Sequence, residues 1–203
     1  MTPEHLYALI ESDMKAVDAV IRDRLHSEVV LVRQVAEYII GGGGKRMRPA
    51  LVLLAAGAMG YEGKRHHDLA AVVEFIHTAT LLHDDVVDES DLRRGRNTAN
   101  AIFGNAASVL VGDFLYSRAF QMMVEVDDMH VMSVLSDATN VIAEGEVLQL
   151  MNCHDADVDE QRYLQVIRYK TAKLFEAAAQ LGAILGGAGP LSLIHISEPT
   201  RPY

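Results

Sequence analysis

Tryptophan is absent from this chain of 203 residues, and cysteine occurs only once, at Cys153. A single cysteine excludes an intrachain disulfide, and we therefore expect a reducing, cytoplasmic location. Basic residues are fewer than acidic ones: the chain has 18 lysines and arginines and 28 aspartates and glutamates, which gives a net charge of −10. Nucleic-acid-binding surfaces are normally basic, so this balance argues against a nucleic-acid partner.

Long uncharged apolar runs are also missing from the chain. No run reaches the length of about 18 residues that a membrane span requires, and acids interrupt the N-terminal stretch where a secretory signal would lie. We expect neither a membrane span nor a secretory signal. Half of the residues are nonetheless hydrophobic, which is enough for one domain with a sizeable core. Any lipid-like ligand then has to be held inside the fold.

Alternating patterns typical of strands are absent, and the apolar residues recur at helical spacing. They lie three and four positions apart over residues 3–24 and 28–40, as on amphipathic helices. Further helices are predicted over residues 50–59, 66–90, 105–124, 131–151 and 158–182, with a glycine turn at residues 41–44. An all-α helical bundle is the predicted fold class.

The last residues do not follow this pattern. Residues 190–203 come after a glycine-rich stretch, contain Pro199 and Pro202, and show no helical face. Two interpretations of this segment are open, a natural terminus and a translated cloning tail, and we favour the cloning tail. Residues 1–189 are then the N-terminal part of a single domain, and residues 190–203 are non-native.

An acidic run closes the helix predicted over residues 66–90. Asp84 and Asp88 are four residues apart, so their carboxylates share a helical face and can reach one hard cation, with Asp85 between them. Three arginines follow: Arg93, Arg94 and Arg96. Carboxylates favour Mg²⁺, with Mn²⁺ as a substitute, over zinc, which prefers histidine and cysteine. The run indicates metal-dependent diphosphate chemistry.

A second cation cluster follows the glycine run. Lys45 and Arg48 are three residues apart and can share a side that suits phosphate oxygens, while the glycines allow close backbone approach. His77 lies two helical turns before Asp84 and points to much the same side. Its interpretations as a core histidine and as a phosphate donor are equally open. Solvated surface charge is the alternative interpretation of both basic clusters.

Three segments together resemble the trans-isoprenyl diphosphate synthases, or polyprenyl synthetases. They are Gly43-Gly44-Lys45-Arg46-Met47-Arg48-Pro49, Leu81-Leu82-His83-Asp84-Asp85-Val86-Val87-Asp88 and Arg93-Arg94-Gly95. The resemblance covers residues 1–189 and implies an isoprenoid synthase-type bundle around a central cavity. It implies a homodimeric, Mg²⁺-dependent trans-prenyltransferase that joins isopentenyl diphosphate to an allylic diphosphate. The implied product is a long, lipid-like all-trans polyprenyl diphosphate, octaprenyl for quinone side chains.

The resemblance also implies roles for individual positions. Asp84 and Asp88 match magnesium ligands, and Asp85 and Lys170 are grouped with them as catalytic. The positions that match contacts to isopentenyl diphosphate are Lys45, Arg48, His77 and Arg94. Those that match contacts to the allylic diphosphate are Arg93, Lys170 and Thr171, and Glu146 and Gln149 match pocket-lining polar positions, with Gln149 grouped with the allylic contacts. Ala79 is the fifth residue before Asp84, where short-chain relatives tend to carry a bulky aromatic residue, and its small size implies a long product.

The second acid-rich motif of these synthases has no counterpart in the chain, because Glu176 and Glu198 are the only acids after Lys173. We therefore expect a bundle that is incomplete at its C-terminus and a chain with little or no synthase activity. A non-catalytic subunit of a heteromeric prenyl synthase and a fragment of a class I terpene cyclase are the alternatives. The segment around Lys45 argues against a cyclase, since cyclases bind no isopentenyl diphosphate.

Overall fold

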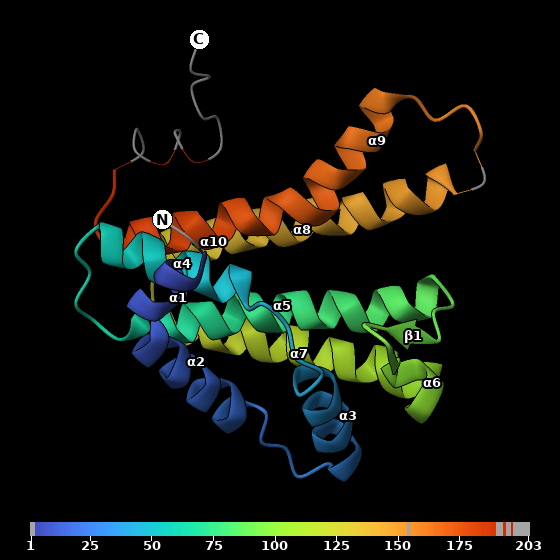
Figure 1. Cartoon of the computed structure of the whole chain (residues 1–203), viewed down its shortest axis with the longest axis horizontal. Coiled ribbons are helices and arrows are strands. Elements are labelled where there is room, and N and C mark those ends of the chain that lie inside the picture. The colour runs from blue at the N-terminus through green and yellow to red at the C-terminus, as the bar shows by residue number, and fades with distance from the viewer. Residues whose placement is uncertain (1–2, 154, 190–192, 194–195, 197–203) are drawn as a thin grey trace.

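The computed structural model describes residues 3–153, 155–189, 193 and 196, so most of the expected tail lies outside the described residues. The elements, shown in Figure 1, are α1 (Pro3–Leu9), α2 (Glu11–Arg24), α3 (Val30–Ile40), α4 (Met47–Ala58), α5 (Arg65–Val87), β1 (Leu92–Arg93), β2 (Arg96–Asn97), α6 (Ala99–Phe103), α7 (Asn105–Val126), α8 (Met129–Asn152), α9 (Glu160–Ile167), the π-helix η1 (Arg168–Ala172) and α10 (Lys173–Leu185). The predicted all-α class is confirmed. Within the described residues, no helix combines the length and the apolar character that crossing a membrane requires.

The short hairpin β1–β2 is the main departure from the predicted elements. Its strands pair Leu92 with Asn97 and Arg93 with Arg96, which leaves a two-residue loop. Both loop residues have positive φ, 54° at Arg94 and 76° at Gly95, as a type I′ turn requires. The sequence analysis did not predict this hairpin, because a hairpin of four paired residues is too short to show an alternating pattern.

Five of the seven predicted helices match single helices of the structure to within three residues at each end, and the other two are divided. The helix predicted over residues 3–24 is divided at Ile10 into α1 and α2. The helix predicted over residues 66–90 ends at Val87, and Glu89 adopts a left-handed φ of 49°, which a continuing right-handed helix excludes. The helix predicted over residues 158–182 is replaced by α9, η1 and α10, with the π-helix in the middle.

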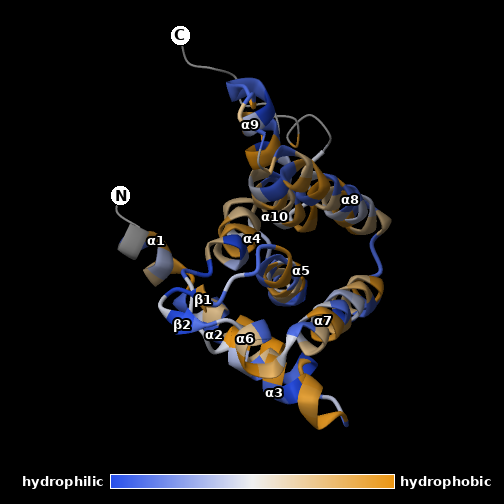
Figure 2. Ribbon diagram, turned by 90° about the vertical axis from the view of Figure 1, so that its right-hand side faces the viewer, coloured by the Kyte–Doolittle hydropathy of each residue, from blue (hydrophilic) through white to orange (hydrophobic). Residues whose placement is uncertain are grey.

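Helix α5 occupies the middle of the bundle, as Figure 2 shows, and packs against α2, α4, α7 and α10. Phe75, Ile76 and Leu82 are fully buried at different angles around it. A helix that is apolar on most sides is typical of a central position. Because burial of an unpaired polar group is costly, the polar side chains of α5 must find partners or face a cavity. The sites described below are built along this helix.

Candidate active site

The two acids predicted to hold a metal lie at the C-terminal end of α5. The Asp88 N–H donates to the Asp84 carbonyl over 2.7 Å, which keeps the helical phase and turns both carboxylates to one face. Asp84 Oδ2 lies 3.1 Å from Lys170 Nζ, and Asp88 Oδ1 accepts a hydrogen bond from Gln149 Nε2 over 3.4 Å. The structure thus brings Asp84, Asp88, Lys170 and Gln149 together. Since a helix C-terminus carries partial negative charge, these acids favour a nearby cation.

Glu146 on α8 adds a third carboxylate to this group. Its Oε2 lies 2.6 Å from Lys170 Nζ, and its Oε1 is buried without a hydrogen-bond partner in the described part of the chain. Burial, and then the charge of Asp84, raise the pKa of Glu146 to about 7, although Lys170 opposes the shift. Burial alone would lower the pKa of Lys170, but its two carboxylate partners raise it. One ammonium among three carboxylates leaves a negative site that fits a divalent cation.

The π-helix η1 brings Lys170 to the acids. Gly145 on α8 faces it at close range, because a Cβ atom at this glycine would lie 2.8 Å from both the Lys170 backbone nitrogen and Tyr169 Cβ. The absence of a side chain at Gly145 therefore lets η1 approach α8. Single π-helical turns are frequent at functional sites, since they re-aim side chains. Thr171, predicted beside Lys170 as a substrate contact, is exposed on the same turn.

Asp85 is separated from the other two acids. It is 1% exposed, and both its oxygens accept hydrogen bonds from Arg93 Nε over 3.0 Å, with a further bond from Arg93 Nη2 over 2.8 Å. A rotation of about 100° per residue along the helix turns Asp85 away from the face of Asp84. The structure gives Asp85 the role of an anchor for Arg93 and the hairpin. It does not place Asp85 beside the predicted metal ligands.

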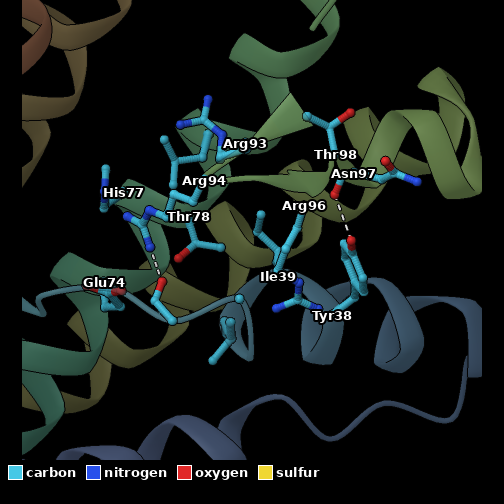
Figure 3. Close-up of a pocket in the computed structure, with 14 residues that line it drawn as sticks. Tyr38, Ile39, Glu74, His77, Thr78, Arg93, Arg94, Arg96, Asn97 and Thr98 are labelled. Carbon is cyan, nitrogen blue, oxygen red and sulfur yellow. Dashed lines mark hydrogen bonds between the residues drawn. The ribbon is translucent and has the colours of Figure 1, made fainter. Parts of the chain in front are cut away.

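A basic cavity of about 460 Å³ lies between the glycine run, α4, α5 and the hairpin. Its lining includes four residues predicted to bind isopentenyl diphosphate: Lys45, Arg48, His77 and Arg94. Figure 3 shows the adjoining pocket, where the hairpin arginines Arg93 and Arg94 come close to His77, while Arg96 lies against Tyr38. Arg94 Nη1 donates to the Gly43 carbonyl, which joins the hairpin to the glycine run. The structure therefore brings together segments that are far apart in the sequence.

The surroundings of His77 and Arg48 lower the pKa of both groups. Burial, followed by the charges of Arg48 and three other arginines, lowers the pKa of His77 to about 3. The imidazole is therefore neutral and offers one N–H to an anion. The Arg48 guanidinium lies 4.3 Å from the centroid of the Phe175 ring, its Nε is buried without a partner among the described residues, and burial lowers its pKa. A cluster of cations around a neutral imidazole suits a polyanion.

A second, larger cavity of about 660 Å³ lies between α5, α7 and α8, at the acidic end of α5. Tyr116, Phe120 and Ile142 give it a largely apolar wall, and Asp84 and Glu146 belong to its lining. This volume is in the range of small-molecule sites, about 300–1,000 Å³. Ala79 is fully buried but is not part of the wall, which Thr80 reaches instead. The prediction that Ala79 controls product length is therefore not supported by a place in this cavity.

Some site residues were not predicted from the sequence. Three aromatic residues on helical faces, Tyr116, Phe120 and Phe175, would ordinarily be predicted as core residues. Their spacing in the sequence does not distinguish a cavity wall from a packed interior. Glu146 matched a polar pocket position, but its contact with Lys170 depends on how α8 and η1 pack.

The chain matches the family model of the polyprenyl synthetases over residues 29–198. It is 60% identical to octaprenyl diphosphate synthase of Escherichia coli (strain K12), over 94% of this chain and 59% of that protein. It is 50% identical to the all-trans-nonaprenyl-diphosphate synthase (geranyl-diphosphate specific) of Rhodobacter capsulatus, over 91% of this chain and 57% of that protein. The chain therefore spans less than two thirds of the length of these relatives.

Solved structures are similar over nearly the whole chain. A polyprenyl synthase from Caulobacter crescentus CB15, complexed with calcium and isoprenyl diphosphate, superposes with a TM-score of 0.93 at 48% identity, covering 96% of this chain and 60% of the other. A decaprenyl diphosphate synthase from Rhodobacter capsulatus superposes with a TM-score of 0.92 at 52% identity, covering 95% of this chain and 60% of the other. The predicted isoprenoid synthase-type fold is confirmed, while the division at residue 189 stays a prediction. On the family match and these likenesses, the chain belongs to the polyprenyl synthetase family.

Proposed function

We propose that the chain carries the two diphosphate sites of a trans-prenyltransferase that joins isopentenyl diphosphate to an allylic diphosphate and builds a long all-trans polyprenyl diphosphate, octaprenyl for quinone side chains. Because the sequence lacks the second acid-rich motif, we expect the chain by itself to have little or no synthase activity. The observation that carries the proposal is the presence of two sites of different chemistry on one helix. His77 in the basic cavity and Asp84 in the acidic group are seven residues apart, or about 10 Å along α5. Two anionic substrates can thus be held close to each other and next to an apolar cavity.

We assign the acidic group to the allylic diphosphate and to Mg²⁺, for which Mn²⁺ can substitute. Asp84 and Asp88 supply hard oxygen ligands, and the unpartnered oxygen of Glu146 adds to the local negative charge. When bound, a divalent ion neutralises a diphosphate leaving group. Lys170 places an ammonium at the same point, so it binds and orients that diphosphate. Gln149 fixes the position of Asp88 through its hydrogen bond.

We assign the basic cavity to isopentenyl diphosphate. Arg48 and Arg94 supply guanidinium groups for its phosphate oxygens, Lys45 adds an ammonium at the rim, and His77 donates from a neutral ring. The allylic carbon–oxygen bond breaks with its electron pair on diphosphate, and the double bond of isopentenyl diphosphate attacks the allylic carbon. Loss of a proton to the released diphosphate then gives a chain longer by five carbons. The wall of Tyr116, Phe120 and Ile142 gives the reacting carbon an apolar side to lie against.

A calorimetric titration of isopentenyl diphosphate into the chain tests the basic site. A hydrogen bond to a charged group contributes about 1.5–3 kcal/mol, so Arg48→Met should weaken binding tenfold to about a hundredfold. The matched control Arg22→Met removes an exposed arginine of α2 and should leave binding unchanged. Equal affinity in all three proteins would refute the assignment.

The acidic site is tested with an allylic diphosphate in the presence and absence of Mg²⁺. Binding should depend on the metal in the unaltered chain and lose that dependence in Asp84→Asn. The class of reaction is tested by chromatography of products, because elongation requires isopentenyl diphosphate whereas cyclisation proceeds without it. Consumption of the allylic substrate alone would favour a terpene cyclase.

The proposal extends to the assembly and the location of the protein. We propose a homodimer in the cytoplasm, which the resemblance and the single cysteine support. Sedimentation equilibrium of the purified chain tests the dimer, and a mass equal to one chain across a hundredfold concentration range would contradict it.

A further inference from the structure

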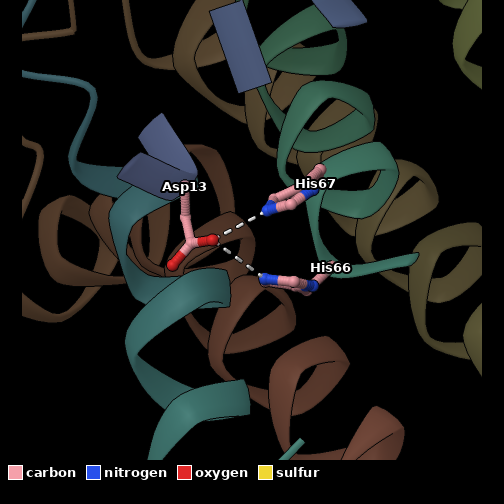
Figure 4. Close-up of side chains that lie close together, drawn as sticks. All are labelled: Asp13, His66 and His67. Atoms are coloured by element: carbon pink, nitrogen blue, oxygen red, sulfur yellow. Dashed lines mark hydrogen bonds and ion pairs between the residues drawn. The ribbon is translucent and has the colours of Figure 1, made fainter. Parts of the chain in front are cut away.

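Two histidines and an aspartate converge far from the proposed active site. Asp13 lies on α2, and His66 and His67 lie in the first turn of α5, as Figure 4 shows. Asp13 Oδ1 is 2.9 Å from His67 Nε2 and 3.6 Å from His66 Nε2. The cluster is separated from Asp84 by 18 residues of α5, which is about 27 Å along the helix. Its chemistry is therefore independent of the acidic group and of the proposed function.

We propose that Asp13, His66 and His67 form a binding site for a divalent transition metal ion with the ligand preferences of Zn²⁺. One ligand atom from each residue lies within 4.8 Å of the others. Around a tetrahedral ion with bonds of 2.0–2.2 Å, ligand atoms are about 3.3–3.6 Å apart. The two distances to Asp13 Oδ1, 2.9 and 3.6 Å, bracket this range, and with all three atoms within 4.8 Å of one another, side-chain rotations can bring them to coordination distance.

Asp13 does not form a good hydrogen bond with both histidines. At 3.6 Å, His66 Nε2 is beyond the distance of a good hydrogen bond to Asp13 Oδ1, so this ring nitrogen is held near the carboxylate without a good hydrogen bond to it. The two imidazole rings lie with centroids 4.0 Å apart, and Tyr61 packs edge-on against His66 at 5.4 Å. These contacts hold both rings beside the same carboxylate oxygen. A metal ion would complete the interactions that one carboxylate cannot supply.

The donor set decides the class of ion. Two imidazole nitrogens and one carboxylate oxygen suit zinc and its neighbours, whereas Mg²⁺ prefers an all-oxygen shell. The His66 and His67 side chains are 11% and 15% exposed, and that of Asp13 is 37% exposed, so the site is open to solvent on the aspartate side. An ion can enter from this side and keep a water as fourth ligand. Bound there, it would tie α2 to the start of α5.

The test is a calorimetric titration of Zn²⁺ into the full chain in the presence of excess Mg²⁺, which competes for carboxylate sites. We expect one zinc ion per chain with micromolar affinity. His67→Gln keeps a donor for Asp13 and so preserves the fold while removing a ligand, and it should weaken zinc binding at least tenfold. Asp13→Asn should have a similar effect. The matched control His130→Gln, on the exposed start of α8, should bind as the unaltered chain does.

Two further readouts separate a metal site from a purely structural cluster. Co²⁺ should give the visible absorption of tetrahedral coordination in the unaltered chain and lose it in His67→Gln. Zinc should raise the thermal midpoint of the unaltered chain and of His130→Gln, but not of His67→Gln. Equal zinc affinity in His67→Gln and the unaltered chain, or no zinc binding by either, would overturn the proposal and leave a histidine–aspartate contact between two helices.

Discussion

Substitution of Gly145 by alanine tests the contact that places Lys170 in the acidic group. An added Cβ would lie 2.8 Å from the Lys170 backbone nitrogen and 3.1 Å from the Tyr169 carbonyl carbon. Such distances are far inside van der Waals contact, and the opposing atoms include backbone, which cannot rotate away. The substitution therefore forces η1 away from α8 and moves the Lys170 ammonium relative to Asp84.

The magnitude follows from two opposing effects. Alanine in place of glycine in a helix interior stabilises by about 1 kcal/mol, whereas overpacking a buried contact by one carbon costs about 1–3 kcal/mol. Because the clash involves backbone atoms, we take the upper part of that range and expect Gly145→Ala to destabilise the chain by about 1–2 kcal/mol. The matched control is Gly57→Ala on α4, where an added Cβ meets nothing within 4 Å. It should stabilise by about 1 kcal/mol.

Urea unfolding followed by circular dichroism measures both variants. The expected result is a shift of the two midpoints in opposite directions, with Gly145→Ala also weakening Mg²⁺-dependent binding of an allylic diphosphate. If Gly145→Ala stabilises the chain as much as Gly57→Ala does, η1 does not pack against α8 as described, and the explanation of the Lys170 position fails.

Three further predictions concern buried groups. The pKa of His77 is about 3 in the folded chain and about 6.5 in the unfolded chain, so between these pH values only the unfolded chain takes up this proton. The free energy of unfolding should therefore fall from pH 6.5 towards pH 3, by about 2 kcal/mol at pH 5. Unfolding curves of His77→Gln should lack this loss. Asp85→Asn should lower the free energy of unfolding by about 1–3 kcal/mol because it weakens the buried anchor of Arg93. Asp88→Asn, at an exposed position, should change that free energy by less than about 0.5 kcal/mol. Equal effects of the two substitutions would contradict the separation of the two acids. In the complete enzyme, Ala79→Tyr should shorten the product seen in chromatography by pushing neighbouring side chains into the apolar cavity, and unchanged length would rule Ala79 out as a determinant.

The acidic group shows what sequence spacing can and cannot predict. The four-residue separation of Asp84 and Asp88 predicts a shared face, and the hydrogen bond between their backbones preserves that face to the end of α5. The spacing also implies that Asp85 points elsewhere, but its pairing with Arg93 depends on the two-residue turn at Arg94 and Gly95. Positive φ at a non-glycine residue such as Arg94 leaves no pattern in apolar periodicity.

The bounds of helices were predicted less well than their existence for a related reason. Periodicity reports which face of a segment is buried, and apolar residues recur along α9, η1 and α10, so it predicts one continuous helix there and does not reveal the π-helical turn. The close approach at Gly145 that accompanies this turn involves a glycine within a helix, which by sequence alone is only a mild destabilising choice. The need for a glycine becomes visible only when the opposing backbone is in place.

Helix α5 accounts for most of the chemistry of the chain, because it is central and its polar residues cannot reach bulk water freely. His66 and His67 face α2 at its start, His77 faces the arginines in its middle, and Asp84 faces α8 and η1 at its end. Each group is compensated by a segment distant in sequence, so the partners follow from packing rather than from local pattern. Two of the buried atoms without a hydrogen-bond partner in the described part of the chain, Arg48 Nε and Glu146 Oε1, lie in the two proposed diphosphate sites, where ligands would complete the structure.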